Sequence, residues 1–220
     1  PDSDTDLEET LSALTDLQRA GKIIAFGTSS LPAPEIVRAH WISEQRGLGR
    51  LRSEQPVYSI LNRGIEREVL PVTQDYGMGT LVWSPLGGGL LTGRYRKGQQ
   101  ADTHRSKFGF RHLKDDQRLD VVEQLIPLAA EAGMPLTHLA VAFVLAHPGV
   151  TSALIGPRTM AHLDDLLAGV EVTLDDDLLD QFDKIVPPGT DVGVLDMAYQ
   201  PPALTDPSLR RRPLTARAAA

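Results

Sequence analysis

The fold is decided by a stretch near the middle of the chain, which runs Gly79-Thr80-Leu81-Val82-Trp83-Ser84-Pro85-Leu86-Gly87-Gly88-Gly89-Leu90-Leu91-Thr92-Gly93-Arg94-Tyr95. Its first residues are mostly apolar, and they give way abruptly to small and polar residues. This pattern is typical of a buried parallel strand that is covered on both faces. The glycines that follow allow the backbone to approach a ligand closely. We therefore predict a strand that ends on a ligand-binding face.

A second stretch of this kind lies downstream, at Ala153-Leu154-Ile155-Gly156-Pro157-Arg158-Thr159. Arg158 can hold a phosphate through its fork of donors. Thr159 precedes a predicted helix, and the N-terminal end of a helix favours negative charge. Two strand ends with phosphate-binding chemistry predict one shared dinucleotide site.

Predicted strands and helices alternate along the chain. Apolar runs predict strands at 23–27, 52–58, 80–83 and 151–155. Three- and four-residue spacings predict helices at 7–17, 34–45, 65–76, 119–132, 136–146 and 160–167, with one more ending at 185. This alternation predicts an α/β fold with a parallel sheet and helices outside it. A (β/α)₈ TIM barrel has eight such units in roughly 250 residues. We therefore expect the C-terminal half of a barrel, about four units plus an extra helix, with the N-terminal strands absent.

The segment between these elements from 92 to 117 is long, polar and glycine-containing, which favours a lid or binding loop. Its histidines, His104 and His112, are expected to be solvated. Residues 1–200 are predicted to form the partial barrel domain, and 201–220 a disordered tail whose arginine cluster is solvated.

The bulk composition excludes several classes of function. At 220 residues the chain is long enough for one domain with a sizeable core. Its net charge of −7 argues against nucleic acid or an anionic membrane as a partner. The absence of cysteine excludes disulfides, thiolate metal sites and cysteine nucleophiles. No spacing predicts a metal site, and no apolar run has the length of a membrane span, so we expect a cytoplasmic protein.

The polar residues at the strand ends have complementary chemistry. Ser29, Ser30 and Gln55 can hydrogen-bond a planar carboxamide, and Trp83 can stack on a flat ring. The backbone N–H groups of 86–90 can surround a pyrophosphate. Taken singly, each residue also fits an ordinary role as a helix cap, a core residue, a turn or a surface charge. Their succession at neighbouring strand ends favours a binding site.

Four ordered motifs resemble the C-terminal portion of the aldo-keto reductase family, of the aryl-alcohol-dehydrogenase-like or potassium-channel-β-like type. The matching segments are Gly21-Lys22-Ile23-Ile24-Ala25-Phe26-Gly27-Thr28-Ser29-Ser30, Gln55-Pro56-Val57-Tyr58-Ser59-Ile60-Leu61-Asn62-Arg63, residues 83–93, and residues 155–165. The resemblance covers the chain up to about residue 202.

The resemblance implies a TIM barrel that uses NADP(H) to reduce an aldehyde or ketone to an alcohol. By position, it assigns three groups of contacts to the cofactor. The nicotinamide end would be held by Ser29, Ser30, Gln55 and Trp83; the pyrophosphate by Ser84, Pro85, Leu86 and Gly88; and the adenosine 2′-phosphate and adenine by Gly156, Arg158, Thr159, His162 and Asp165. Family members often carry Asn where Ser30 and Leu166 stand.

The catalytic residues of the family are an Asp, a Tyr, a Lys and a His, and all of them match positions before the start of this sequence. We therefore nominate no catalytic residue and expect the 220-residue chain alone to be inactive. Tyr58, Tyr76 and Tyr95 do not lie in the motif of the proton-donating tyrosine.

Three functions stay open at this point. The first is an oxidoreductase of this family, for which the chain supplies the cofactor-binding half. The second is a non-catalytic module of the same fold that binds the cofactor or regulates a partner. The third is an unrelated barrel enzyme with a phosphate-bearing substrate. Half a barrel exposes unpaired sheet edges, which predicts self-association as a homo-oligomer or instability.

Overall fold

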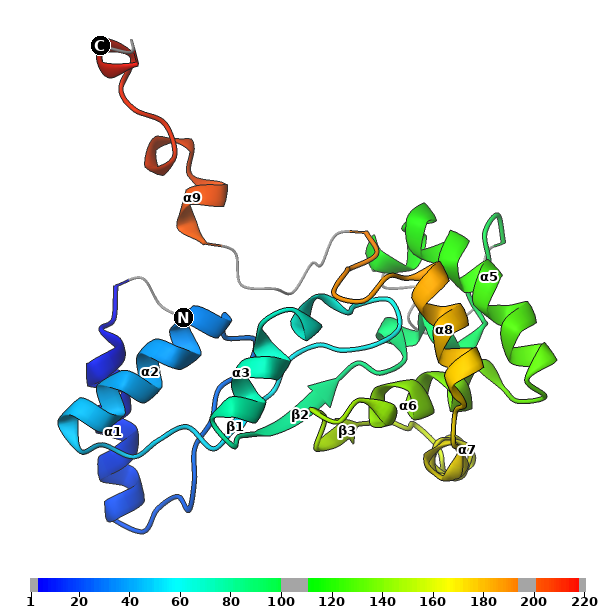
Figure 1. The fold of residues 1–220 in the computed structure, drawn as a ribbon, viewed down its shortest axis with the longest axis horizontal. Helices are drawn as coiled ribbons and strands as arrows, with labels where there is room; N and C mark the ends of the chain where they lie inside the picture. Colours follow the sequence, from blue (N-terminus) through cyan, green and yellow to red (C-terminus); the bar gives the residue numbers. More distant parts are fainter. Residues whose placement is uncertain (1–3, 100–110, 194–200, 218–220) are drawn as a thin grey trace.

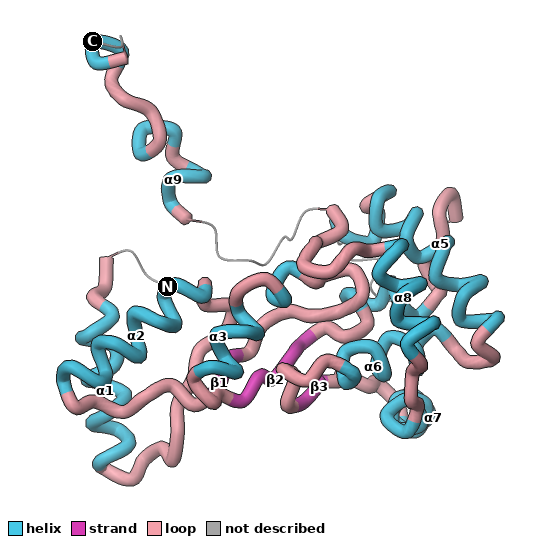
Figure 2. The backbone as a smooth tube through the Cα atoms, in the orientation of Figure 1, coloured by secondary structure: helices cyan, strands magenta, loops and turns pink. Residues whose placement is uncertain are grey.

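The computed structural model describes residues 4–99, 111–193 and 201–217 (Figure 1). The chain is an α/β fold with a small parallel sheet, and helices lie at both ends of the sheet and beside it (Figure 2). The elements are α1 (Leu7–Arg19), α2 (Ala33–Arg46), β1 (Ser53–Glu54), η1 (Gly64–Glu66), α3 (Val69–Asp75), β2 (Gly79–Trp83), η2 (Gly87–Thr92), η3 (Arg111–Lys114), α5 (Asp116–Glu131), α6 (Leu136–Ala146), β3 (Ser152–Leu154), α7 (Met160–Ala168), η4 (Gly169–Glu171), α8 (Asp176–Ile185), α9 (Pro202–Thr205), η5 (Pro207–Leu209) and η6 (Leu214–Ala216).

The sheet has the order β1-β2-β3, with both pairs parallel. The register places Ser53 opposite Gly79 and Trp83 opposite Leu154. Successive strands are therefore neighbours, with helical segments between them. As a result, the carboxyl ends of all three strands lie at the same edge of the sheet.

The strand predicted at 23–27 does not form, although its end runs beside β1. The amide of Arg52 donates to the carbonyl of Phe26, and the amide of Thr28 donates to the carbonyl of Ser53, each at 2.9 Å. Thr28 forms an isolated parallel bridge with Glu54. The preceding residues have no such pairing among the described residues, and Ile24 is 95% exposed. Phe26 is buried but Ile24 is not, so this outer segment lacks the two-sided burial that the apolar run predicted.

The single helix predicted at 65–76 is divided into η1 and α3. Pro71 explains the division, because a proline in a helix interior has no N–H to donate and clashes with the preceding turn. Since α3 begins at Val69, Pro71 lies in its first turn, where the missing donor is tolerated. The other predicted helices form close to their expected ranges, and α6 matches its range of 136–146.

Two apolar clusters hold the helices to the sheet. The larger joins α5, α6 and α8 to β2 and includes Val82, Leu125, Phe143 and Phe182. The smaller joins α1 and α2 to the Phe26 segment. These helix groups lie at opposite ends of the sheet (Figure 1). Apolar packing at both ends of the sheet thus helps to hold the strands whose carboxyl ends form the predicted binding edge.

Residues 201–217 form only short turns and the four-residue α9, and nearly all of them are exposed. They contribute no residue to either apolar cluster. The division into a domain at 1–200 and a disordered tail stays a prediction.

Within the described ranges, no single helix is long and apolar enough to cross a membrane. The helices α5 and α6 together meet that test by length and composition, but they are bent by 95° at their break.

Candidate functional site

The nicotinamide-binding residues predicted from the sequence begin with two segments that the structure joins directly. The Ser29 hydroxyl donates to the carbonyl oxygen of Gln55 at 2.9 Å, and the Gln55 amide donates to the carbonyl of Thr28 at the same distance. Ser29 is exposed and Gln55 is half-buried. Because its proton is used inside the protein, the Ser29 hydroxyl is left as an acceptor, which suits the N–H of a carboxamide.

Trp83 lies at the adjacent strand end. Its amide donates to the carbonyl of Pro56 at 3.0 Å, and its carbonyl accepts from the amide of Tyr58 at 3.2 Å. These bonds fix Trp83 beside the segment that follows Gln55. Its side chain is only partly buried, so the indole is available for stacking.

Ser30 and Ser84 share an unusual backbone conformation. Their φ angles are +54° and +60°, and they are the only non-glycine residues with positive φ in the part of the chain that the structure describes. This conformation is uncommon for residues with a side chain, and such strain concentrates at ligand sites. Ser84 directly follows β2, and Ser30 lies two residues after the parallel bridge at Thr28.

The glycine loop after Ser84 is closed by its own hydrogen bonds. The Gly88 amide donates to the Ser84 hydroxyl oxygen at 2.8 Å, while the amides of Gly87 and Gly89 donate to the carbonyls of Ser84 and Leu86. The predicted ring of backbone donors at 86–90 is therefore partly occupied within the loop. A pyrophosphate would instead meet the Ser84 hydroxyl proton, which the Gly88 bond does not use.

Glycine is required in this loop for steric reasons as well. All three glycines have positive φ, and a Cβ on Gly88 would lie 2.6 Å from Nε2 of His112. His112 is thus partly buried against the loop, and the expectation that it is solvated is wrong. His104 lies outside the described residues.

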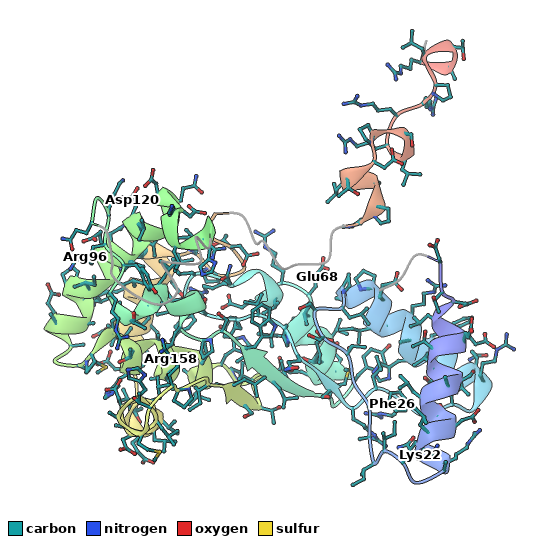
Figure 3. The ribbon with its side chains drawn as sticks, turned by 180° about the vertical axis from the view of Figure 1, so that it is seen from behind. Lys22, Phe26, Glu68, Arg96, Asp120 and Arg158 are labelled. Atoms are coloured by element: carbon teal, nitrogen blue, oxygen red, sulfur yellow. The ribbon has the colours of Figure 1, made fainter. Side chains whose placement is uncertain are left out.

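The last strand end leads into α7. The Thr159 hydroxyl accepts from the amide of His162 at 3.2 Å and caps the helix. Arg158 is exposed just before this helix (Figure 3). A Cβ added to Gly156 would meet no atom within 4 Å, so there is open space at this position. A cation beside a capped helix N-terminus, close in sequence to the open position at Gly156, suits a phosphate.

His162 and Asp165 are placed by neighbouring elements. Nε2 of His162 lies 3.4 Å from a guanidinium nitrogen of Arg94, which connects α7 to the end of η2. The Asp165 carboxylate contacts Nε2 of His138 at 3.0 Å and accepts from the Thr137 hydroxyl at 3.3 Å. Asp165 is thus held against the start of α6.

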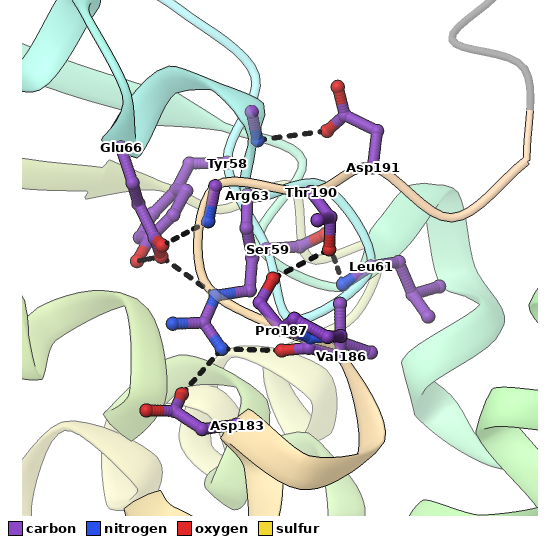
Figure 4. Close-up of polar contacts among 12 residues, drawn as sticks. Tyr58, Ser59, Leu61, Arg63, Glu66, Asp183, Val186, Pro187, Thr190 and Asp191 are labelled. Atoms are coloured by element: carbon purple, nitrogen blue, oxygen red, sulfur yellow. Dashed lines mark hydrogen bonds and ion pairs between the residues drawn. The ribbon is translucent and has the colours of Figure 1, made fainter.

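A buried ion network anchors the chain that follows Gln55 (Figure 4). Nε of Arg63 lies 2.8 Å from Glu66 Oε1, and Nη1 lies 2.6 Å from Asp183 Oδ1 on α8. The other Glu66 oxygen accepts from the Gly189 amide at 2.8 Å. The network joins the loop after β1 to the end of α8.

Tyr58 belongs to the same network. Its hydroxyl donates to Glu66 Oε1 at 2.7 Å, and the residue is 1% exposed. Burial, reinforced by the Glu66 carboxylate, raises the pKa of the Tyr58 phenol. A tyrosine that donates a proton to a substrate needs exposure to it and a lowered pKa, so this geometry argues against Tyr58 as an acid.

Comparison with known proteins identifies the family. Residues 1–187 match the Aldo/keto reductase family. The chain belongs to this family. It is 38% identical over 186 residues to the uncharacterized oxidoreductase YrpG of Bacillus subtilis, covering 84% of this chain and 56% of YrpG.

Other family relatives carry different names. A probable voltage-gated potassium channel subunit beta of Oryza sativa is 31% identical over 194 residues, or 84% of this chain and 59% of its own. Protein tas of Escherichia coli is 33% identical over 181 residues, or 81% of this chain and 52% of its own. The chain therefore spans little more than half the length of these relatives.

Sequence reasoning missed Glu54, a buried residue of this aldo/keto reductase chain that lies beside the candidate site. It lies on β1 directly before Gln55 and is 0% exposed. Its carboxyl oxygens contact the amide of Leu31, at 3.1 Å, and the hydroxyl of Thr28. The available signal was a charged residue at an inward position of a short predicted strand.

No group of three or more His, Cys, Asp or Glu side chains suited to a metal ion occurs in the described ranges.

The burial of Glu54 predicts a pH effect on stability. Burial, only partly offset by hydrogen bonds from Thr28 and Leu31, raises the pKa of this carboxyl from its ordinary value of 4.5. The folded chain therefore binds the proton more tightly than the unfolded chain, and the stability contribution present below pH 4.5 is lost as pH rises through the raised pKa. We expect the Tm of wild type to fall relative to that of Glu54→Gln as the pH rises over this range. Thermal unfolding at a series of pH values measures it, and a flat or opposite trend would contradict the assignment.

Proposed function

We propose that this chain forms the cofactor-binding half of an NADP(H)-dependent oxidoreductase that reduces aldehydes or ketones to alcohols. The observation that carries the proposal is the meeting of Ser29, Gln55 and Trp83 at one edge of the sheet, joined by backbone and side-chain hydrogen bonds. Family membership supports the same class of reaction. The parallel order β1-β2-β3, extended by the segment at Thr28, supports half of a (β/α)₈ barrel.

The donor set fits a nicotinamide dinucleotide from end to end. Ser29, Ser30 and Gln55 would hold the carboxamide, and Trp83 would stack on the ring. A bound nicotinamide supplies the hydride that reduces the carbonyl carbon. The chain contributes position and orientation, which raise the effective concentration of the reacting groups.

The other end of the site favours a 2′-phosphate. Arg158 and Thr159 would hold it, with Ser84, Pro85, Leu86 and Gly88 near the pyrophosphate and Gly156, His162 and Asp165 near the adenosine. An exposed guanidinium beside a helix N-terminus favours NADP(H) over NAD(H), because only the former carries the additional phosphate.

A non-catalytic role is the second candidate. The similarity to a probable voltage-gated potassium channel subunit beta favours a module that acts as one subunit of an assembly. Such a module would bind the cofactor without turnover. The two candidates share the cofactor site. NADPH oxidation that depends on an added aldehyde or ketone, by the protein that carries this chain, distinguishes them.

Arg158→Ala is expected to weaken NADPH binding about tenfold or more, because a charge-assisted bond to phosphate contributes roughly 1.5–3 kcal/mol. NADH binding is expected to remain unchanged. Quenching of Trp83 fluorescence measures both affinities in a Trp41→Phe background, which removes the exposed tryptophan on α2. Arg38→Ala, on the outer surface of α2, serves as the control. Equal losses for both cofactors would contradict the phosphate assignment, and failure of the parent chain to bind NADPH would refute the cofactor site.

A further inference from the structure

Glu54 connects the two ends of the turn at 28–31, which follows the segment that runs beside β1 at Phe26 and Thr28. One carboxyl oxygen contacts the hydroxyl of Thr28, where the turn begins, and the other accepts from the amide of Leu31, where it ends, at 3.1 Å. Ser29 and Ser30 lie between these two anchors. A single buried side chain therefore holds both ends of the turn by hydrogen bonds.

The turn needs this support because its conformation is strained. Ser30 has a φ of +54°, and a residue with a side chain adopts this conformation only where its surroundings impose it. The Ser29 hydroxyl bond to the Gln55 carbonyl depends on the same turn. Loss of the anchor at Leu31 would free the turn to relax and would separate Ser29 from Gln55.

A carboxyl group is an unusual choice for this position if it serves the fold alone. Buried parallel strands are usually apolar, and burying a carboxyl is unfavourable. Glu54 has no ion-pair partner among the described residues, so it does not act by charge pairing. The hydrogen bonds of its carboxyl group go to the turn that carries Ser29 and Ser30.

We propose that Glu54 is a positioning residue, which shapes the turn at 28–31 so that Ser29 and Ser30 face the nicotinamide end of the cofactor beside Gln55. This inference rests on the proposed cofactor-binding function. It assigns to Glu54 an effect on the nicotinamide half of the ligand only, because the residues proposed for the 2′-phosphate follow β3.

Two substitutions of similar size separate the hydrogen bonds from the volume of the side chain. Glu54→Gln keeps an acceptor for the Leu31 amide and a polar partner for Thr28, whereas Glu54→Leu removes both. Isothermal titration with NADPH and with adenosine 2′,5′-bisphosphate, which lacks the nicotinamide, reports on the two ends of the site. Hydrogen exchange of the Leu31 amide reports on the turn without any ligand.

Glu54→Leu is expected to weaken NADPH binding about tenfold or more, with the bisphosphate affinity within about twofold of wild type and faster exchange at Leu31. Glu54→Gln is expected to restore NADPH binding to within about threefold of wild type. Unchanged NADPH affinity in Glu54→Leu, or equal loss of both ligands in a folded variant, would overturn the proposal. If Glu54→Leu does not fold, Thr28→Val tests one anchor alone, with the same selective loss for NADPH expected and an unchanged affinity contradicting it. A wild-type chain that binds neither ligand refutes the cofactor site itself, which is a different result from normal wild-type binding that Glu54 does not affect.

Discussion

Replacing Arg63 by Met is expected to lower the free energy of unfolding by about 3–5 kcal/mol, since removing one partner of a buried ion pair leaves the other charge unpaired. The Arg63 side chain is 7% exposed, and that of Glu66 is 9% exposed. Methionine retains much of the volume but none of the donors. Denaturant unfolding of the two chains measures the difference.

Arg96→Met provides the matched control. Arg96 also pairs with a glutamate, Glu123, at 2.5 Å, but its side chain is 37% exposed. Water can solvate Glu123 after the substitution, so we expect a much smaller loss. Equal losses for the two variants would show that burial does not govern the energetics. Adding Glu66→Gln to Arg63→Met is expected to recover part of the loss, because the unpaired carboxylate is then removed.

Gly27→Ala is expected to lower the free energy of unfolding by about 1–3 kcal/mol through overpacking. A Cβ at this position would overlap the carbonyl oxygen and the hydroxyl of Ser53. The Ser53 carbonyl cannot move away freely, because it accepts from the amide of Thr28. The segment at 26–28 must then separate from β1, which also displaces Ser29 from Gln55. NADPH affinity and stability should therefore fall together.

Gly156→Ala is the control for this prediction. The added Cβ would meet no atom within 4 Å, so the free energy of unfolding should stay within about 0.5 kcal/mol of wild type. Chemical denaturation of both variants makes the comparison. A Gly27→Ala chain as stable as Gly156→Ala would mean that the segment is not held against β1 as described.

Local pattern was sufficient to predict those elements whose burial is decided by near neighbours. The apolar run of α6 and the glycine-flanked β2 form close to their expected ranges. The helix expected at 65–76 was divided because Pro71 dictates where a helix can begin, a local signal that periodicity alone does not weigh. The strand expected at 23–27 failed because its neighbours in space, not its composition, determine pairing.

The candidate binding edge was predictable in outline but not in detail. Ser29, Gln55 and Trp83 do come together, because parallel strands place their carboxyl ends at one edge. The support from Glu54 to Thr28 joins residues that are 26 positions apart, and no local pattern encodes it. The internal bonds of the glycine loop likewise depend on the conformation of Ser84, which the sequence does not reveal.

The ion network has a consequence for the order in which the protein acquires its structure during synthesis. Arg63 and Asp183 are separated by 120 positions, and Glu66 and Gly189 by 123. A ribosome that has released β1 and its following loop must still translate α5, α6, β3 and α8 before these partners exist. Contacts between distant residues form late. The loop after Gln55 therefore becomes ordered only after α8 has been made. Ordering of the proposed nicotinamide end is thus expected to wait until the residues up to Gly189 have been synthesised.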